Sequence, residues 1–138
     1  MGQLDFETMR NDGWEPVIRS DYTDLIGPIW QRCVNGQWEF TMCCDAKHRN
    51  INGVVHGGVL MSFADQAMGR TAAPLHSPLS TVQLDSQFVD VARIGEFLRA
   101  APRIVRDTKS LFFMQTDIYS NDRLVSIASG LWKKLKPV

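Results

Sequence analysis

The stretch that decides the fold is residues 59–73, which read VLMSFADQAMGRTAA. It lacks the alternation of a strand and is rich in Leu, Met and Ala, which favour helices. Pro74 follows and ends the helix, because proline has no N–H and clashes with the preceding turn. Apolar residues cover most of the circumference, which is typical of a buried helix. They are Val59, Leu60, Met61, Phe63, Ala64, Ala67 and Met68. A buried helix predicts a sheet wrapped around it.

Segments on both sides of this helix alternate between apolar and polar residues, as half-buried strands do. Asn35-Gly36 separates the first two segments and is typical of a tight hairpin. Pro102 interrupts a weaker segment and indicates an edge strand or a bulge. Strands around a single helix predict an α+β fold, with an antiparallel sheet of about six strands wrapped around one long central helix. The predicted strands are residues 29–34, 38–44, 81–88, 97–105, 111–118 and 125–131.

The chain has 138 residues, the usual length of one domain. It contains neither an internal repeat nor a linker-like stretch, so residues 1–138 are expected to form a single domain. Residues 1–27 are mixed and polar. We expect them to be an N-terminal extension with a short helix and a connecting loop.

The charge balance bears on possible partners. Basic and acidic residues both number 15, so the net charge is zero, which argues against a nucleic-acid partner. The charges are nevertheless divided along the chain. Residues 1–92 include 6 basic and 11 acidic residues, whereas residues 93–138 include 9 basic and 4 acidic residues. The second half is either a basic rim for an anionic ligand or an ordinary solvated surface.

The three cysteines, Cys33, Cys43 and Cys44, form an odd set with an adjacent pair. They are a poor basis for disulfides and fit a reducing compartment. Cys43, Cys44 and His48 lack the second spaced pair of a zinc site, so no metal is expected. No apolar run is long enough for a transmembrane helix, and the N-terminus lacks a signal-peptide pattern. We therefore expect a cytoplasmic protein with no membrane partner.

The densest candidate chemistry lies in residues 48–69, HRNINGVVHGGVLMSFADQAMG. Gly57 and Gly58 precede the predicted helix. Unpaired N–H groups and the positive end of the helix dipole would there stabilise a carbonyl oxygen that becomes negative. Asp65 lies inside the apolar helix, where a carboxylate is costly unless it has partners. Each feature also has an ordinary structural reading: a tight turn, or an acid that is exposed or paired. Two polar side chains flank the turn, Asn50 and His56.

This combination resembles the hotdog-fold acyl-CoA thioesterases, and more narrowly their phenylacetate-pathway (PaaI) branch. The family pattern is Asn-x-x-Gly-x-x-His-Gly-Gly followed by a helix that carries Asp. The resemblance extends over about residues 28–135. Two positions near the expected coenzyme A entrance depart from the family: Thr108 replaces a usual Gly and Val91 a usual Pro. The matching residues are Asn50, Gly53, His56, Gly57, Gly58 and Asp65, then Phe88, Ala92, Gly95 and Glu96.

The resemblance implies hydrolysis of an acyl-CoA thioester in a site shared by two subunits. The Gly57 N–H, with Gly58, would polarise the thioester carbonyl. The opposing subunit's Asp65 would attack this carbonyl as a nucleophile or activate a water molecule as a base. Asn50 would position the water or the carbonyl. His56 would hold the loop or add a hydrogen bond to the oxyanion.

The resemblance also implies how substrate is held. Thr81 matches a position where some relatives place a hydroxyl beside the acid, so it would orient the water. No cofactor is implied, because coenzyme A is part of the substrate. A homodimer with a continuous sheet is expected, and the family commonly stacks two dimers into a homotetramer. Coenzyme A phosphates would be held by Arg103, Arg106 and Lys109. The acyl pocket would involve Met61, Phe63 and Met68.

Two other interpretations use the same fold. One is a non-catalytic protein that binds or senses acyl-CoA. The other is a dehydratase that acts on acyl-carrier protein. Such dehydratases combine a His with a carboxylate near the start of the long helix, in a different pattern. The spacing of nine residues between His56 and Asp65 favours the thioesterase.

Overall fold

The computed structural model describes residues 6–138. No helix in this part of the chain is long and apolar enough to cross a membrane. The elements, in chain order, are α1 (Phe6–Asn11), β1 (Glu15–Pro16), α2 (Asp21–Ile26), β2 (Trp30–Val34), β3 (Gln37–Cys43), the 3-10 helix η1 (Ala46–His48), α3 (Gly57–Ala72), β4 (Leu79–Phe88), β5 (Phe97–Ala100), β6 (Arg103–Asp107), β7 (Leu111–Ser120) and β8 (Arg123–Lys134).

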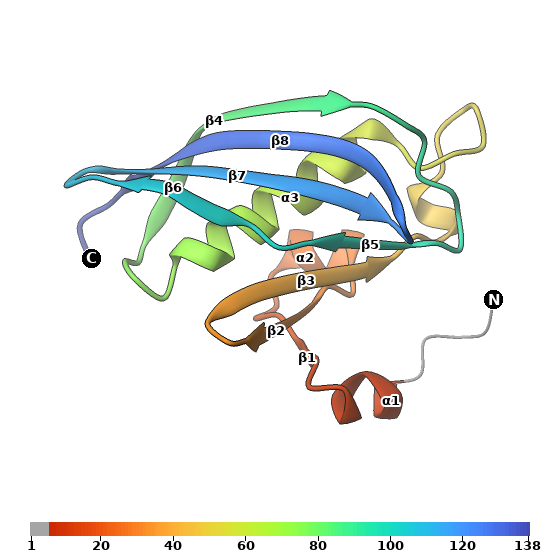
Figure 1. Ribbon diagram of the computed structural model, residues 1–138, viewed down its shortest axis with the longest axis horizontal. Coiled ribbons are helices and arrows are strands. Elements are labelled where there is room, and N and C mark those ends of the chain that lie inside the picture. The colour runs from red at the N-terminus through yellow and green to blue at the C-terminus, as the bar shows by residue number, and fades with distance from the viewer. Residues whose placement is uncertain (1–5) are drawn as a thin grey trace.

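The strands form one antiparallel sheet that curves around α3 (Figure 1). Neighbouring strands follow the order β1-β2-β3-β5-β7-β8-β4, and β6 also pairs with β7. The predicted α+β hotdog fold with a long central helix is therefore confirmed. The helix begins two residues earlier than the predicted range, because His56 caps it and Gly57 already belongs to its first turn.

The sheet has eight strands instead of about six. The segment predicted as one strand over residues 97–105 is two strands, β5 and β6, which both pair with β7. The chain leaves the sheet between them at residues 101–102. Pro102 explains the break, because proline has no N–H to donate to a strand ladder. The short strand β1 adds the eighth member by pairing with β2.

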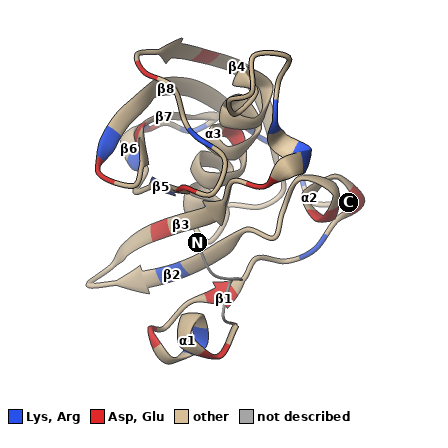
Figure 2. Cartoon of the chain, turned by 90° about the vertical axis from the view of Figure 1, so that its right-hand side faces the viewer, with Lys and Arg blue, Asp and Glu red and all other residues tan. Residues whose placement is uncertain are grey.

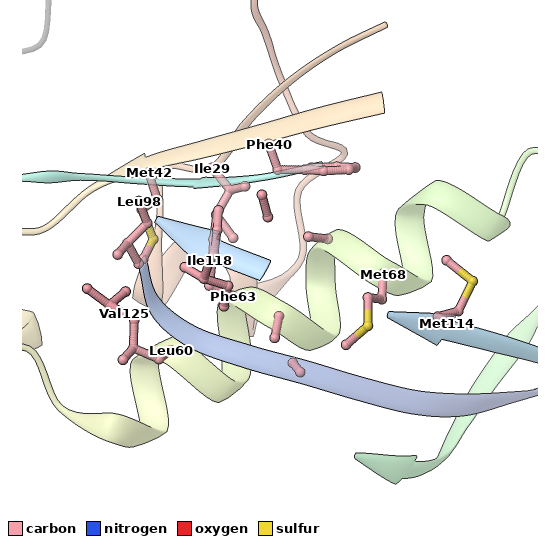
Figure 3. Packing of buried hydrophobic residues seen from close by; sticks show 14 of the residues in the cluster. Ile29, Phe40, Met42, Leu60, Phe63, Met68, Leu98, Met114, Ile118 and Val125 are labelled. Carbon is pink, nitrogen blue, oxygen red and sulfur yellow. The ribbon is translucent and has the colours of Figure 1, made fainter. Parts of the chain in front are cut away.

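The core lies between α3 and the concave face of the sheet (Figure 3). Phe63, Ala64 and Ala67 of α3 are completely buried. Burial of a large apolar side chain contributes roughly 1.5–3 kcal/mol, so this helix is a main source of stability. The large buried residues that surround it include Ile29, Phe40, Met42, Leu98, Phe112, Met114, Ile118 and Val125.

Residues 6–29 hold more structure than the expected short helix and loop. They form two helices, α1 and α2, joined by β1. The Arg32 guanidinium lies over the buried Trp14 ring, 4.2 Å from its centroid. The Phe6 ring packs against Trp30, with 5.1 Å between ring centroids. These contacts attach the N-terminal segment to β2.

Strand β4 is an open edge of the sheet. Only β8 pairs with it among the described strands. It is ten residues long, and Val82 and Phe88 on it are both 52% exposed. A long edge strand presents unpaired N–H and C=O groups, which are a template for pairing with a second chain.

Candidate active site

The start of α3 carries the predicted oxyanion donors. The His56 ring caps the helix, because its Nδ1 accepts a hydrogen bond of 2.8 Å from the Gly58 N–H. The proton of the neutral ring therefore resides on Nε2. The Gly58 N–H is occupied by this bond. The Gly57 N–H has no acceptor among the described residues, so it is the free donor of the pair.

Phe88, at the end of β4, lies over Gly57. A β-carbon built on Gly57 would stand 3.3 Å from the Phe88 ring. The absence of a side chain therefore lets the aromatic ring approach the helix start. The family resemblance matches Phe88 as the aromatic residue of the pattern and gives it no role in the site. Its contact with Gly57 depends on a fold that brings positions 57 and 88 together.

Asn50 shapes the loop that leads to the helix. Its Oδ1 accepts hydrogen bonds from the N–H groups of Asn52, at 2.8 Å, and Val54, at 3.2 Å. Its backbone N–H donates to the Val54 carbonyl at 2.7 Å. Such bonds are typical of Asn in tight loops. Only the Nδ2 group of Asn50 has no partner among the described residues.

A second loop supports the helix start. The Val55 N–H donates to the Ala92 carbonyl at 2.9 Å. Glu96 holds this loop by accepting hydrogen bonds from the Arg93 N–H at 2.9 Å and from Arg123 at 2.5 Å. Burial by itself would raise the pKa of Glu96, but the bonds from Arg123, Arg93 and Ser120 hold this pKa below its ordinary value. The Gly-acid pair at residues 95–96 is thus part of the scaffold.

Asp65 is half-buried on α3 and has the partner that the resemblance implied. The Thr81 hydroxyl donates a hydrogen bond of 2.6 Å to Asp65 Oδ1. Asp65 Oδ2 accepts no bond from the described residues. Both side chains line a groove of about 360 Å³ between α3 and the start of β4, which we call the Asp65 groove. Its wall also includes Gln66, Gly69, Arg70 and Trp132.

The side chains expected to line an acyl pocket are placed differently. Phe63 and Met68 are completely buried in the core, and neither lines the Asp65 groove. Met61 is half-buried and is also absent from the groove wall. The reason is helix phase, because positions 63, 67 and 68 face the sheet while positions 65, 66, 69 and 70 face outward. The sequence reasoning missed Gln66, Arg70 and Trp132.

The cations expected to hold coenzyme A do not line the Asp65 groove within one chain. Arg103 hydrogen-bonds to Gln115 on the neighbouring strand. Arg106 and Lys109 are exposed, and their side chains have no hydrogen bond or ion pair to the described residues.

Folding pairs three of the nine cations of the second half with carboxylates of the described residues. Figure 2 shows basic and acidic positions at many places on the folded ribbon. Three cations of this half pair with carboxylates, Arg99 with Glu39, Arg123 with Asp90 and Glu96, and Lys134 with Asp107.

Gly57 and Asp65 do not meet within one chain. They are eight residues apart on the same helix, or about 12 Å along its axis. One thioester group is too small to bridge these positions. A reaction that uses both groups therefore needs a second copy of the chain.

Comparison with known proteins identifies the family. Residues 52–127 match the thioesterase superfamily. The chain belongs to this superfamily. It is 33% identical over 126 residues to a Pseudomonas aeruginosa protein named "Putative esterase PA0474", covering 88% of this chain and 94% of the relative. The matched region contains Gly57, Asp65 and Thr81, while Asn50 and Trp132 of the candidate site lie just outside it.

Solved structures agree with this assignment at the level of the fold. The E. coli PaaI protein from the phenylacetic acid degradation operon superposes with a TM-score of 0.79 at 18% identity, over 87% of this chain and 88% of that chain. A hypothetical thioesterase of Streptococcus pneumoniae, solved with coenzyme A, superposes with a TM-score of 0.69 at 20% identity, over 88% of each chain. The resemblance to PaaI-type thioesterases inferred from the sequence is confirmed, and it supports a hydrolase.

Proposed function

We propose that the protein hydrolyses acyl-CoA thioesters, and that Asp65 and Gly57 carry the chemistry. The observation that carries this proposal is the Asp65–Thr81 hydrogen bond inside an open groove. A carboxylate with one oxygen held by a hydroxyl and the other oxygen free is oriented to accept a proton. Membership of the thioesterase superfamily supports this reaction class.

The second part of the proposal is a composite site in a homodimer. The two functional groups lie towards opposite ends of β4, because Thr81 contacts Asp65 and Phe88 lies over Gly57. Antiparallel pairing of two β4 edges about a two-fold axis would place the Phe88 end of one copy beside the Thr81 end of the other. The Gly57 N–H of one copy would then face the Asp65 groove of its partner. The same family also forms tetramers by stacking such dimers, and we extend the proposal to a homotetramer.

In the proposed reaction, the free Gly57 N–H and the positive end of the α3 dipole polarise the thioester carbonyl. A water molecule adds to the carbonyl carbon, and Asp65 takes one of its protons. The carbon–sulfur bond then breaks, and the coenzyme A thiolate leaves with that proton. The products are the free acid and coenzyme A. Direct attack by Asp65 would instead form a mixed anhydride and release the coenzyme A thiolate. Hydrolysis of this anhydride at the Asp65 carboxyl carbon would place oxygen-18 from labelled water in the enzyme in a single turnover, whereas the general-base route would place it only in the free acid.

Support for coenzyme A as the thiol portion comes from two directions. The Streptococcus pneumoniae structure with the same fold was solved with coenzyme A. In this chain, Arg106 and Lys109 are exposed cations free to contact phosphates. If they hold coenzyme A, the KM for acyl-CoA should rise with ionic strength, since salt screens exposed charges. A KM that does not respond to salt would remove these residues from the proposal.

The reaction is tested by comparing the wild type with Asp65→Asn on a short panel of acyl-CoA thioesters, with free coenzyme A measured by chromatography. Loss of the proposed base should lower kcat by at least roughly 10²–10⁴. Equal activity of the two proteins would exclude a role for Asp65. Binding of acyl-CoA without hydrolysis by the wild type would instead identify a non-catalytic acyl-CoA binder.

The composite site is tested by mixing inactive subunits. Asp65→Asn chains and Gly57→Pro chains are unfolded together and refolded as a mixture. Random pairing gives about half mixed dimers, each with one intact site, so about a quarter of the wild-type activity should return. Each variant refolded alone is the control. A mixture as inactive as its components would mean that both groups act within one chain.

A further inference from the structure

The wall of the Asp65 groove next to the catalytic candidates contains an arginine without an acid partner. Arg70 donates from Nε to Gln66 Oε1 at 3.0 Å, and from Nη2 to the Ile18 carbonyl at 3.0 Å and Thr23 Oγ1 at 3.5 Å. No carboxylate pairs with Arg70 within residues 6–138, and its Nη1 group has no acceptor there. All its partners are neutral.

Burial makes it costly to leave the Arg70 cation without an anionic partner. Arg70 is half-buried, and loss of contact with water lowers the pKa of its guanidinium from the ordinary value. The group still stays charged, because an arginine pKa lies far above neutrality. A buried cation is normally compensated by an anion, since neutral dipoles replace lost hydration only in part. Asp65 is the carboxylate in the groove wall, but it is held by Thr81 and makes no ion pair with Arg70. The groove therefore presents a guanidinium that no ion pair within the described residues neutralises.

Two neighbouring groups add hydrogen-bond donors to the same wall. Gln66 Oε1 accepts from both Thr23 and Arg70, so the amide Nε2 is left as a free donor. Trp132 has an indole N–H, which can only donate. This Nε1 lies 3.2 Å from the place where a β-carbon on Gly69 would stand, and it has no acceptor among the described residues. Gly69 thus leaves the indole N–H accessible from the groove.

We propose that this wall binds an acyl group that ends in a carboxylate, and that Arg70 determines this specificity. The inference rests on the proposed thioesterase function, with the thioester carbonyl beside Asp65. Arg70 follows Asp65 by five residues, which is about 7.5 Å along the helix. A six-carbon dicarboxylic chain can span that separation with its far carboxylate against the free Nη1 group of Arg70. A groove of about 360 Å³ is large enough for such a group.

The test compares adipyl-CoA with hexanoyl-CoA, which has the same carbon count and a methyl end. Wild type should prefer adipyl-CoA in kcat/KM. Arg70→Gln should lower kcat/KM for adipyl-CoA by about 10–100-fold, as expected for a lost charge-assisted hydrogen bond, and should change hexanoyl-CoA by only a few-fold. Arg70→Lys, which keeps the charge but not the fork, should give an intermediate loss for adipyl-CoA.

The control is Arg19→Gln. Arg19 is an exposed cation just before the start of α2. It pairs with Asp24, outside the Asp65 groove. Its loss removes one positive charge without touching the proposed site, so the ratio of the two substrates should not change. A thermal melt of each variant checks that α2 still docks on α3. A merely structural role of Arg70 would lower activity on both substrates alike and leave their ratio unchanged.

The remaining outcomes separate the sources of the anion. Equal losses on both substrates leave the ratio unchanged and overturn the acyl proposal. They would assign Arg70 to a coenzyme A phosphate if the melting temperature is unchanged, and to a structural role if it falls. If wild type hydrolyses neither thioester, the proposed function fails. The dissociation constants of adipyl-CoA and hexanoyl-CoA are then compared at equilibrium. If the wild type binds adipyl-CoA more tightly and Arg70→Gln loses this preference, the specificity for a terminal carboxylate is still supported.

Discussion

Replacing Gly57 with proline removes one N–H group and keeps the rest of the helix start. Gly57 is the first residue of α3, a position that favours proline because its N–H has no partner within the helix. His56 has φ −62° and ψ 135°, which is the extended region that a residue before proline adopts. We therefore expect Gly57→Pro to fold with α3 intact.

The expected loss of activity follows from the role of the missing donor. Removal of one oxyanion donor costs about 10²–10³ in kcat, or about 2.7–4 kcal/mol. Proline also adds a β-carbon that would meet the Phe88 ring at 3.3 Å. Phe88 is 52% exposed, so a small movement of its ring relieves this contact. Gly57→Ala adds the same carbon and keeps the N–H, so it isolates the effect of the donor.

The assay is kcat with hexanoyl-CoA, measured by chromatography of free coenzyme A, together with circular dichroism and a thermal melt. Gly57→Ala should stay within a few-fold of the wild type, whereas Gly57→Pro should lose two to three orders of magnitude, about 10²–10³. A folded Gly57→Pro protein as active as Gly57→Ala would refute the assignment of this N–H to the oxyanion.

Three further outcomes are expected. Thr81→Val removes the 2.6 Å hydrogen bond to Asp65 and should lower kcat by about tenfold with little change in KM. Thr81→Ser keeps a hydroxyl and should retain most of the wild-type kcat. Equal kcat values for the two variants would contradict a role for the hydroxyl. Burial raises the pKa of the Cys44 thiol to about 12, whereas Cys33 is exposed. A thiol-specific reagent should therefore label Cys33 in the native protein and Cys44 only after unfolding, which peptide mass analysis would show. Labelling of Cys44 in the native protein would contradict this prediction. The pKa of Glu96 lies below its ordinary value of 4.5 in the folded protein, so its ionised form stabilises the fold above that value and this contribution is lost as pH falls through the lower folded pKa. Urea unfolding at decreasing pH should show a smaller acid loss for Glu96→Gln than for the wild type, and parallel losses would remove Glu96 from the explanation.

Local sequence patterns predicted the parts of the fold that depend on local preferences. The hairpin between β2 and β3 was readable because its turn needs positive φ, and the structure has φ 52° at Asn35 and 79° at Gly36. The sequence predicted one short helix in the N-terminal segment, where the structure has two, α1 and α2, of six residues each. Helices this short are stable only through tertiary contacts, so the sequence pattern alone does not define them. Such contacts include the bond of 2.6 Å between Tyr22 and Ser62.

The residues of the candidate site also differ in whether the sequence alone could reveal them. Gly57 and Asp65 were found from the sequence, since a glycine before a helix and an acid within an apolar helix are unusual at those positions. Arg70 gave no such signal, because an arginine near the end of a helix is ordinary. Acids are present on the surrounding elements, Asp21 and Asp24 on α2 and Asp65 on α3. Only the packing of α2 against α3 reveals that the described contacts of Arg70 go to neutral groups instead.

The sequence by itself determined the central helix, the antiparallel strands around it and the family of the chain. It did so because the apolar periodicity and the His-Gly-Gly turn are properties of neighbouring residues. The tertiary structure alone decided which N–H is free at the helix start and which side chains face the Asp65 groove. It also showed which cations of the second half, Arg99, Arg123 and Lys134, are paired with carboxylates. These properties join residues that are distant in the chain, and their charges and donors acquire a function only when folding sets their distances.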